Sequence, residues 1–375
     1  MKSPIQFFGC ICLVAFVAAC GNKASENVEA EHIDPSLKNS FSYDFFVGAA
    51  INNGIIEEKD SLATALLKKE FNSITPENIM KWMHIHPSSD KFNFEIADKY
   101  VDLGQRNNFH IVGHTLVWHS QLADWINQVN DSSAMTVILK NHINTIVNRY
   151  KGKIDSWDVV NEALNEDGTL RKSIFLEVLG DSYLELAFET AAKADPDVQL
   201  IYNDYNLTNP EKRAGVIRLV KKLQEKNIKI DAVGMQGHWN LEGPTLEEIE
   251  NSIIAYHDAG VKVSISELDV TVLPNPWDLE GAEVSQNFEN SPSMNPYPES
   301  LPDSVQNKLA KRYQDIFKLF RKHRDKIDRV TFWGINDGSS WLNNWPIDDR
   351  TNYPLLFDRN YRPKKAYESV MELNK

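Results

Sequence analysis

The stretch SWDVVNEALNED, residues 156–167, joins a short apolar strand pattern to a carboxylate. Residues 155–160 have the length and the polar flanks of a buried strand. Asn161 and Glu162 follow where that strand is expected to end. A carboxylate in such a place is costly to desolvate unless it is paired or used in chemistry. Glu162 is therefore a candidate functional residue, although a solvated acid at the start of a loop is the commoner arrangement.

A second stretch repeats this arrangement. VKVSISELDV, residues 261–270, contains a β-rich run over 261–266 that finishes in Glu267. Two acids that each end a strand indicate a catalytic pair, because acid/base chemistry at one bond needs two groups brought together.

The same rhythm of strand, loop and helix runs through most of the chain. Strand patterns are expected at residues 45–51, 71–75, 109–118, 155–160, 198–203, 231–236, 261–266 and 329–333. Helical patterns are expected at residues 60–70, 134–150, 183–194, 210–226, 245–259 and 304–323, and from Pro363 onward, with Asp60 as the cap of the first. This alternation predicts a (β/α)8 TIM barrel, with reactive groups at the C-terminal ends of the strands. An open doubly wound sheet is the alternative, but no glycine-rich phosphate loop follows an early strand.

Size and charge narrow the class of protein. The chain has 375 residues, of which 42% are hydrophobic, enough for one large barrel domain over residues 41–375. The net charge of −13 argues against a nucleic-acid partner, because no basic stripe is present to neutralise phosphates. A neutral or sparsely charged polymer fits this charge better. We expect a monomer by default.

The N-terminus reads as an export signal. Residues 1–19 combine Lys2 with an apolar run, and VAACG at 17–21 resembles a bacterial lipoprotein cleavage box with Cys20 as the lipidated residue. A plain secretory signal cut near Ala19 is the alternative. Residues 20–40 are polar and read as a flexible tether. These features predict an exported enzyme that meets a bacterial membrane only through its lipid anchor, on the periplasmic or cell-surface face of the outer membrane.

Several segments together resemble glycoside hydrolase family 10, the endo-β-1,4-xylanases. They are PENIMKW (76–82), GHTLVWH (113–119), WDVVNEAL (157–164), YNDYN (202–206) and SELDV (266–270), and the resemblance extends from about Phe46 to the C-terminus. It implies that Glu162 is the acid/base and Glu267 the nucleophile of a retaining hydrolase that needs no cofactor. Retention requires carboxyl groups about 5–5.5 Å apart.

The resemblance also implies a set of sugar contacts. Glu77, Asn78 and Lys81 would meet sugar hydroxyls before the cleaved bond, and His114 and Trp118 would line the same cleft. Glu77, Asn78 and Lys81 could instead form the acidic first turn of a helix. His114 could instead be a histidine of the core.

Further contacts are expected from later strand ends. Asn161 and Gln236 are expected to bind substrate. Trp333 and Trp341 are expected to do so as well, since flat indole faces suit the apolar faces of pyranose rings. Tyr205 is assigned to the same set, although its hydroxyl could instead touch the nucleophile or its ring could simply pack.

The resemblance also implies that one histidine, His238, contacts the nucleophile. A neutral His238 beside Glu267 would fix the orientation and protonation of that carboxylate. Asp269 is expected behind this histidine.

The spacing of the other histidines is compatible with a metal site. His84 and His86 have ligand-like spacing, as do His110, His114 and His119. His119 would point to the opposite side of an extended strand from the other two, so the three would not converge on one ion. We therefore predict no metal.

The reading that follows is an endo-β-1,4-xylanase acting on xylan or xylo-oligosaccharides by double displacement. The alternatives are a related β-1,4-glycanase on glucan and a non-catalytic glycan-binding surface lipoprotein, which the presence of Glu162, Glu267 and His238 together disfavours. Residues 274–302, rich in Pro, Asn and Ser, read as an insertion that we expect to wall the cleft beyond the cleaved bond.

Overall fold

The computed structural model describes Met1, residues 35–279 and residues 284–374. The expected signal peptide, Cys20 and the tether up to residue 34 lie outside the described residues. The compact barrel unit begins at Pro35, earlier than the expected boundary at 41. Leu37 is fully buried, and its backbone N–H donates to Glu70 Oε2 at 3.0 Å. Residues 35–40 therefore belong to the folded domain and not to a tether.

A closed parallel barrel forms the centre of this unit. Among the described residues the strands are β1 (Phe46–Ile51), β2 (Ser73–Pro76), β3 (His110–Trp118), β4 (Ser156–Asn161), β5 (Gln199–Asp204), β6 (Ala232–Met235), β7 (His238–Asn240), β8 (Lys262–Thr271) and β9 (Ile327–Phe332). The sheet order is β6-β5-β4-β3-β2-β1-β9-β8-β7, and a further pairing of β6 with β8 closes the ring. The strands of this ring are the predicted eight, and β7 is a short addition on β8, so the (β/α)8 TIM barrel is confirmed.

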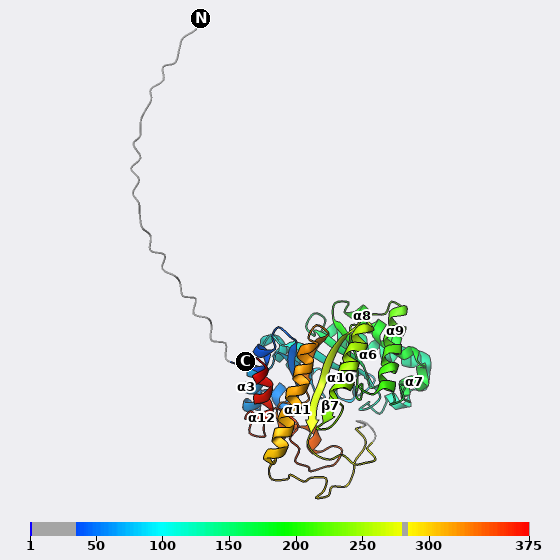
Figure 1. Cartoon of the computed structure of the whole chain (residues 1–375). Helices are drawn as coiled ribbons and strands as arrows, with labels where there is room; N and C mark the ends of the chain where they lie inside the picture. The colour runs from blue at the N-terminus through cyan, green and yellow to red at the C-terminus, as the bar shows by residue number, and fades with distance from the viewer. Residues whose placement is uncertain (2–34, 280–283, 375) are drawn as a thin grey trace. The chain divides into compact units, whose positions relative to one another are not determined.

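Helices cover the outside of the ring (Figure 1). They are α1 (Leu37–Ser40), α2 (Asn53–Ile56), α3 (Ser61–Glu70), α4 (Trp82–Ile85), α5 (Glu95–Arg106), α6 (Ser132–Arg149), α7 (Ile174–Leu179), α8 (Ser182–Ala194), α9 (Pro210–Glu225), α10 (Leu246–Asp258), α11 (Asp303–Lys322) and α12 (Lys365–Met371), with 3-10 turns η1 (Ile126–Gln128), η2 (Asp337–Ser339), η3 (Trp341–Asn343) and η4 (Glu372–Asn374). Asp60 caps α3 as expected, because its carboxylate accepts from the N–H of Ala63 at 2.9 Å.

Helix α5 is absent from the predicted series. Its buried residues Ala97, Tyr100, Val101 and Gly104 recur at a spacing of three and four, which places them on one face. The signal was present in the sequence, but polar residues separate these positions and dilute the apolar pattern.

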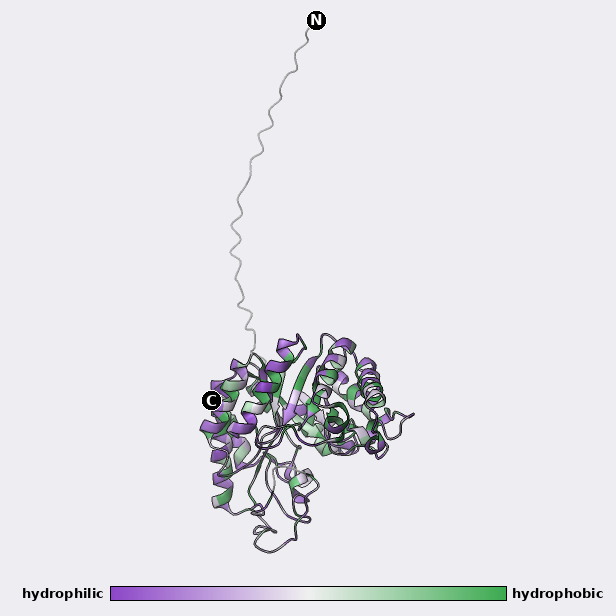
Figure 2. Cartoon of the chain, turned by 90° about the vertical axis from the view of Figure 1, so that its right-hand side faces the viewer, coloured by the Kyte–Doolittle hydropathy of each residue, from purple (hydrophilic) through white to green (hydrophobic). Residues whose placement is uncertain are grey.

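The core fills the barrel and the space between strands and helices. Figure 2 shows apolar and polar residues alternating along the helices around it. Close packing constrains the GHTLVWH segment. A Cβ at Gly113 would lie 2.1 Å from Cε3 of Trp157, which is itself buried. Glycine is therefore required where β3 passes this indole ring.

Two strand ends place the acids. Glu162 follows β4 directly, with a φ of 56° in the left-handed region. Glu267 was expected at the end of its strand, but β8 continues to Thr271. The reason is β7, which pairs with the extension through His238 and Asp269.

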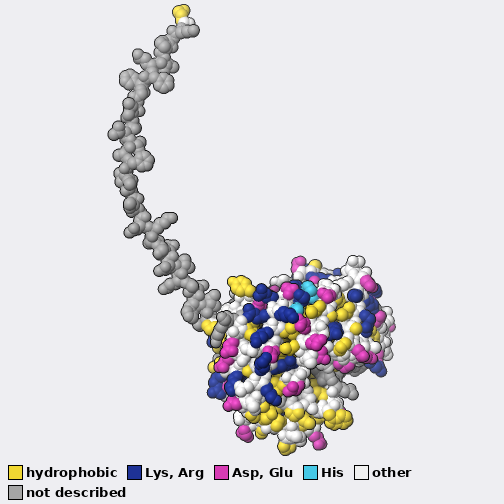
Figure 3. Space-filling view, in the orientation of Figure 1, with side chains coloured by type: hydrophobic (Ala, Val, Ile, Leu, Met, Phe, Trp, Pro, Cys, Tyr) yellow, Lys and Arg dark blue, Asp and Glu magenta, His cyan; other side chains and the backbone are white. Residues whose placement is uncertain are grey.

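The surface carries both signs of charge. Basic and acidic side chains are interspersed on the face seen in Figure 3. None of the described helices has the length and apolar character needed to cross a membrane.

Candidate active site

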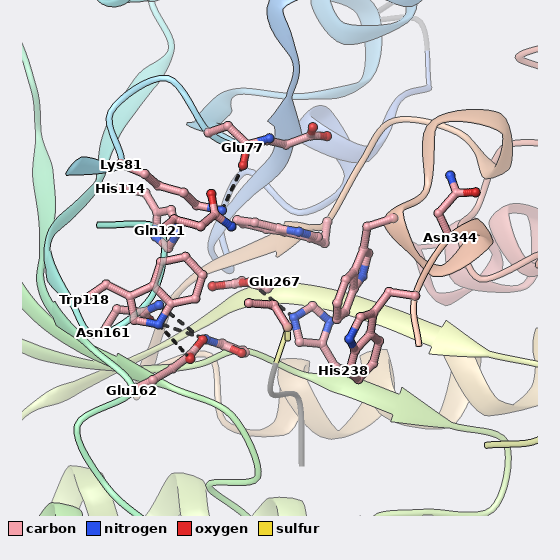
Figure 4. Close-up of a pocket in the computed structure, with 16 residues that line it drawn as sticks. Glu77, Lys81, His114, Trp118, Gln121, Asn161, Glu162, His238, Glu267 and Asn344 are labelled. Carbon is pink, nitrogen blue, oxygen red and sulfur yellow. Dashed lines mark hydrogen bonds and ion pairs between the residues drawn. The ribbon is translucent and has the colours of Figure 1, made fainter. Parts of the chain in front are cut away.

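A pocket of about 310 Å³ opens where the C-terminal ends of the strands meet (Figure 4). The predicted site residues that line it are Glu77, Asn78, Lys81, His114, Trp118, Asn161, Glu162, Gln236, His238, Glu267, Trp333 and Trp341. Barrel topology brings these positions together because every parallel strand ends at the same face.

The pocket has four further lining residues that were not predicted: Gln121, Val284, Asn344 and Trp345. Gln121 follows the end of β3 by three residues, and Val284 lies in the 274–302 segment that was expected to wall the cleft. Asn344 and Trp345 lie after β9, and Trp345 stacks on Trp341 with ring centroids 4.5 Å apart.

Glu162 is held by three donors. Its carboxylate accepts from Trp118 Nε1 at 2.7 Å, from Gln236 Nε2 at 3.0 Å and from Asn161 Nδ2 at 3.2 Å. Burial raises the pKa of Glu162, and the charge of Asp204 acts in the same direction. This carboxyl group therefore retains its proton to higher pH than an ordinary glutamate.

Glu267 is as buried as Glu162, each with 5% of its surface exposed, but its neighbours differ. Asn203 Nδ2 donates to Oε1 at 2.8 Å, and His238 Nε2 lies 3.2 Å from Oε2. Burial alone would raise the pKa of Glu267, but the interactions with His238, His114 and Asn203 outweigh it, and the pKa falls below its ordinary value. Glu267 is therefore the charged member of the pair.

His238 lies between two carboxylates. Its Nδ1 is 3.1 Å from Asp269 Oδ2, on the side opposite Glu267, and Asp269 also accepts from Trp341 Nε1 at 2.8 Å. Burial lowers the pKa of His238, but Asp269 and Glu267 outweigh burial and raise the pKa to about 10. With an acid on each side, His238 is in surroundings that favour the imidazolium over the neutral ring that was expected.

Asn203 connects the two halves of the site and was not among the predicted residues. Its Nδ2 donates to Asn161 Oδ1 at 2.9 Å as well as to Glu267, while Ser266 Oγ donates to its Oδ1. Its backbone carbonyl accepts from the N–H of Glu162 at 2.8 Å. The signal was its position near the end of β5, within YNDYN.

A polar wall faces the acids from β2. Lys81 donates to Asn78 Oδ1 at 3.0 Å, and its ammonium group lies 4.9 Å from the centre of the Trp118 ring. Desolvation lowers the pKa of Lys81, against the nearby negative charges of Glu267 and Glu162. Desolvation also raises the pKa of Glu77 to about 7, although Lys81 opposes it.

An aromatic wall completes the pocket. His114, oriented by Asp158 at 2.8 Å, meets Trp333 with ring centroids 5.5 Å apart. Trp341 lies over His238 at 4.9 Å between centroids and continues into Trp345.

Tyr205 does not line this pocket, in contrast to the other predicted sugar contacts. Its hydroxyl contacts the guanidinium group of Arg171, and its ring lies 3.7 Å from Lys212 Nζ. Lys212 in turn pairs with Asp204 at 2.9 Å. The structure thus places Tyr205 in a cationic cluster beside the pocket.

The histidine spacing that raised the question of a metal has a packing explanation at His86. This residue is buried and stacks on Phe92 at 3.9 Å between centroids, and its Nδ1 lies 3.0 Å from that of His142. Over the described part of the chain, no group of three His, Cys, Asp or Glu side chains is placed to hold a metal ion.

The fold and the site together define a class of protein. Two buried carboxyl groups with opposite pKa shifts, in a pocket that indole rings line on the C-terminal face of a β/α barrel, are the machinery of a glycoside hydrolase. The family model for glycosyl hydrolase family 10 matches residues 36–373, and the chain belongs to that family.

Individual relatives are consistent with membership of this family. The chain is 43% identical over 344 residues to endo-1,4-β-xylanase A of Xylanibacter ruminicola, covering 90% of this chain and 93% of that protein. It is 39% identical over 340 residues to a β-1,4-xylanase of Dictyoglomus thermophilum, covering 90% and 91%. Among solved structures, an endoxylanase of the same family from a sugarcane soil metagenome superimposes with a TM-score of 0.87 at 45% identity, covering 90% of this chain and 100% of that one.

Proposed function

We propose that this chain is a retaining endo-β-1,4-xylanase that hydrolyses internal xylosidic bonds of xylan. The observation that carries the proposal is that Glu162 and Glu267 line one pocket, where burial raises the pKa of Glu162 while the neighbours of Glu267 lower its pKa. The xylanase relatives supply the substrate class.

The reaction proceeds in two displacements. Glu267 attacks the anomeric carbon while Glu162 gives its proton to the leaving glycosidic oxygen, so the bond to that oxygen breaks as the glycosyl-enzyme forms. Glu162, now ionised, takes a proton from water, and the resulting hydroxide attacks the anomeric carbon. Glu267 departs as a carboxylate, Glu162 is protonated again, and the product keeps the β-configuration.

The residues around the acids support these steps. The imidazolium of His238 keeps Glu267 ionised, and Asn203 fixes the direction of its attacking oxygen. The indole rings of Trp118, Trp333 and Trp341 supply flat apolar faces for the sugar rings.

The test is the stereochemistry of the first products. Xylohexaose is incubated with the barrel domain, and the anomeric protons of the earliest fragments are followed by NMR. We expect internal cleavage and initial β-anomer, with negligible activity on carboxymethylcellulose. Initial α-anomer would mean inversion and a different role for Glu267, while equal rates on xylan and carboxymethylcellulose would remove the assignment to xylan.

We propose in addition that the enzyme is exported and anchored through a lipid on Cys20. The support is the apolar run before this residue and the resemblance to a lipoprotein cleavage box. Cells that express the full chain with radiolabelled palmitate should label it, and Cys20→Ser should abolish the label. An unlabelled wild-type protein in the culture medium would favour a plain secretory signal.

A further inference from the structure

The backbone around Glu162 is held by two acceptors on β5. The N–H of Glu162 donates to the carbonyl of Asn203 at 2.8 Å, and the next N–H, that of Ala163, donates to the hydroxyl of Tyr202 at 3.1 Å. Glu162 has a φ of 56°. A residue other than glycine keeps such a left-handed conformation only where its surroundings hold it. The two hydrogen bonds therefore fix the direction in which the Glu162 side chain leaves the backbone.

Tyr202 and Asp204 flank Asn203 on β5, and side chains alternate between the two faces of a strand. Because Asn203 donates to Glu267 in the barrel, the side chains of Tyr202 and Asp204 leave the strand on its other face. The hydroxyl of Tyr202 donates to Asp204 Oδ2 at 2.6 Å. One oxygen thus accepts from Ala163 and donates to Asp204, so the tyrosine hydroxyl has a defined donor and a defined acceptor.

A buried ion pair fixes this acceptor in turn. Asp204 and Lys212, at the start of α9, are both fully buried. Lys212 Nζ lies 2.9 Å from Asp204 Oδ1 and 3.2 Å from Glu166 Oε1. The backbone N–H of Tyr205 also donates to Asp204 Oδ1, at 2.9 Å. A buried carboxylate with donors on both oxygens is satisfied in this one position, and it would be costly to move it away from its cation.

The side chains of this network act at a distance from the reacting atoms. Tyr202, Asp204 and Lys212 are not part of the lining of the catalytic pocket. Glu162 is part of it, and Figure 4 shows its carboxyl group beside Trp118, from which it accepts. A proton donor works only within hydrogen-bond reach of the atom that it protonates. The network can therefore influence the reaction only through the position of the Glu162 carboxyl group.

We propose that Tyr202 is a positioning residue for the acid/base, and that Asp204 and Lys212 hold it in place. The proposal rests on the xylanase function argued above and deepens it. The hydroxyl of Tyr202 anchors the backbone at Ala163, so that the carboxyl group of Glu162 meets the oxygen of the leaving sugar. Loss of this anchor weakens proton transfer to that oxygen and leaves the attack of the nucleophile intact.

The experiment compares two substrates whose leaving groups differ in their need for a proton. Xylohexaose releases a sugar whose oxygen must take the proton of Glu162, whereas 2,4-dinitrophenyl β-xylobioside releases a phenolate that needs none. Tyr202→Phe removes only the hydroxyl group. It should lower kcat/KM for xylohexaose about tenfold and leave kcat/KM for the aryl xylobioside unchanged, because kcat/KM covers only the steps up to the glycosyl-enzyme.

Tyr100→Phe is the matched control. Tyr100 is also fully buried, and its hydroxyl donates to the carbonyls of Ile74 on β2 at 2.8 Å and of Val112 on β3 at 2.7 Å. These carbonyls belong to strands that do not carry the acid/base. Loss of this hydroxyl should therefore not separate the two substrates.

Asp204→Asn tests the same network should Tyr202→Phe fail to fold, which circular dichroism shows. It keeps an oxygen for the hydroxyl of Tyr202 but loses the charge paired with Lys212, so it should separate the two substrates in the same direction on the plateau of the pH profile. In a folded variant, equal changes on both substrates, or no change on either, would overturn the inference alone. A wild-type enzyme inactive on both substrates would instead overturn the xylanase function and this inference together.

Discussion

Two glutamates with the same covalent structure and the same exposure have pKa values shifted in opposite directions in this site. Glu162 accepts hydrogen bonds from the neutral side chains of Trp118, Gln236 and Asn161, and burial raises its pKa by more than the charge of His119 lowers it. Glu267 lies against an imidazolium, which favours the charged form. The division of roles is therefore made by the neighbours.

The first prediction concerns the pH dependence of kcat/KM. Glu267 must be ionised, so activity is lost as pH falls through its lowered pKa. Glu162 must be protonated, so activity is lost as pH rises through its raised pKa. We expect a broad bell-shaped profile on xylohexaose, whose two limbs report the coupled pair.

The variant Glu162→Gln separates the two limbs. On an aryl xylobioside with a leaving group that needs no proton, its first displacement should continue and the alkaline limb should disappear. A retained alkaline limb would assign that limb to another residue.

The second prediction concerns His238. His238→Asn removes the positive charge between Glu267 and Asp269, so the pKa of Glu267 should rise and the acid limb should move to higher pH. His323→Asn is the control, since His323 also pairs with a carboxylate, Glu250, at 2.6 Å but lies at the end of α11. An acid limb that does not move in His238→Asn would mean that the other neighbours, His114 and Asn203, keep Glu267 ionised.

At the scale of elements, the site depends on how strands β4, β5 and β8 are joined. Asn203 is fully buried on β5 and binds Asn161 on β4 and Glu267 on β8. It does not line the pocket, so it can act only by placing residues that do.

The third prediction follows from this connection. Asn203→Ala should lower kcat about a hundredfold through misplacement of Glu267 and change KM little. Gln199→Ala is the matched control, because Gln199 is an amide at the other end of β5 that donates to Asp328 at 2.6 Å. A rise in KM with unchanged kcat would contradict the positioning role. Circular dichroism of both variants shows whether the barrel is retained.

The fourth prediction concerns the two loops that Arg350 joins. Arg350→Ala leaves the carbonyls of Pro274 and Trp345 without this donor and should lower the free energy of unfolding by about 1–3 kcal/mol. Arg362→Ala should cost less than about 0.5 kcal/mol, because its pair with Asp358 is on the surface. Urea unfolding measures both changes in the free energy of unfolding, provided that its dependence on urea concentration (the m-value) is the same in each variant. Equal losses would mean that other contacts hold the loops.

Local patterns predicted most of the elements, and the misses have physical reasons. The ring of strands and the positions of Glu162 and Glu267 follow from short-range periodicity. Strand β7 and the extension of β8 arise from the pairing of His238 with Asp269, which are distant in sequence. A pattern that spans only a few neighbouring residues cannot reveal such a pair, because the two partners lie in different parts of the chain.

At the scale of the whole molecule, the charge of His238 likewise cannot be predicted from local sequence patterns. The sequence places a histidine and an acid near the nucleophile, but only the folded chain shows that the ring nitrogens face one carboxylate each. The same holds for Trp345, whose contact with the pocket depends on how a loop is folded, and for Leu37, whose burial against α3 moves the domain boundary.

Closure of the barrel limits how readily enzyme molecules can aggregate through their sheet edges when they are crowded together. A sheet with free edges offers unpaired backbone groups to neighbouring molecules and invites aggregation. Here β6 pairs with β8, so within the described chain the outermost backbone edge is the three-residue strand β7, and Arg312 Nε donates to the carbonyl of Asn240 at its end. Molecules crowded on one fibre therefore have little strand edge through which to recruit each other.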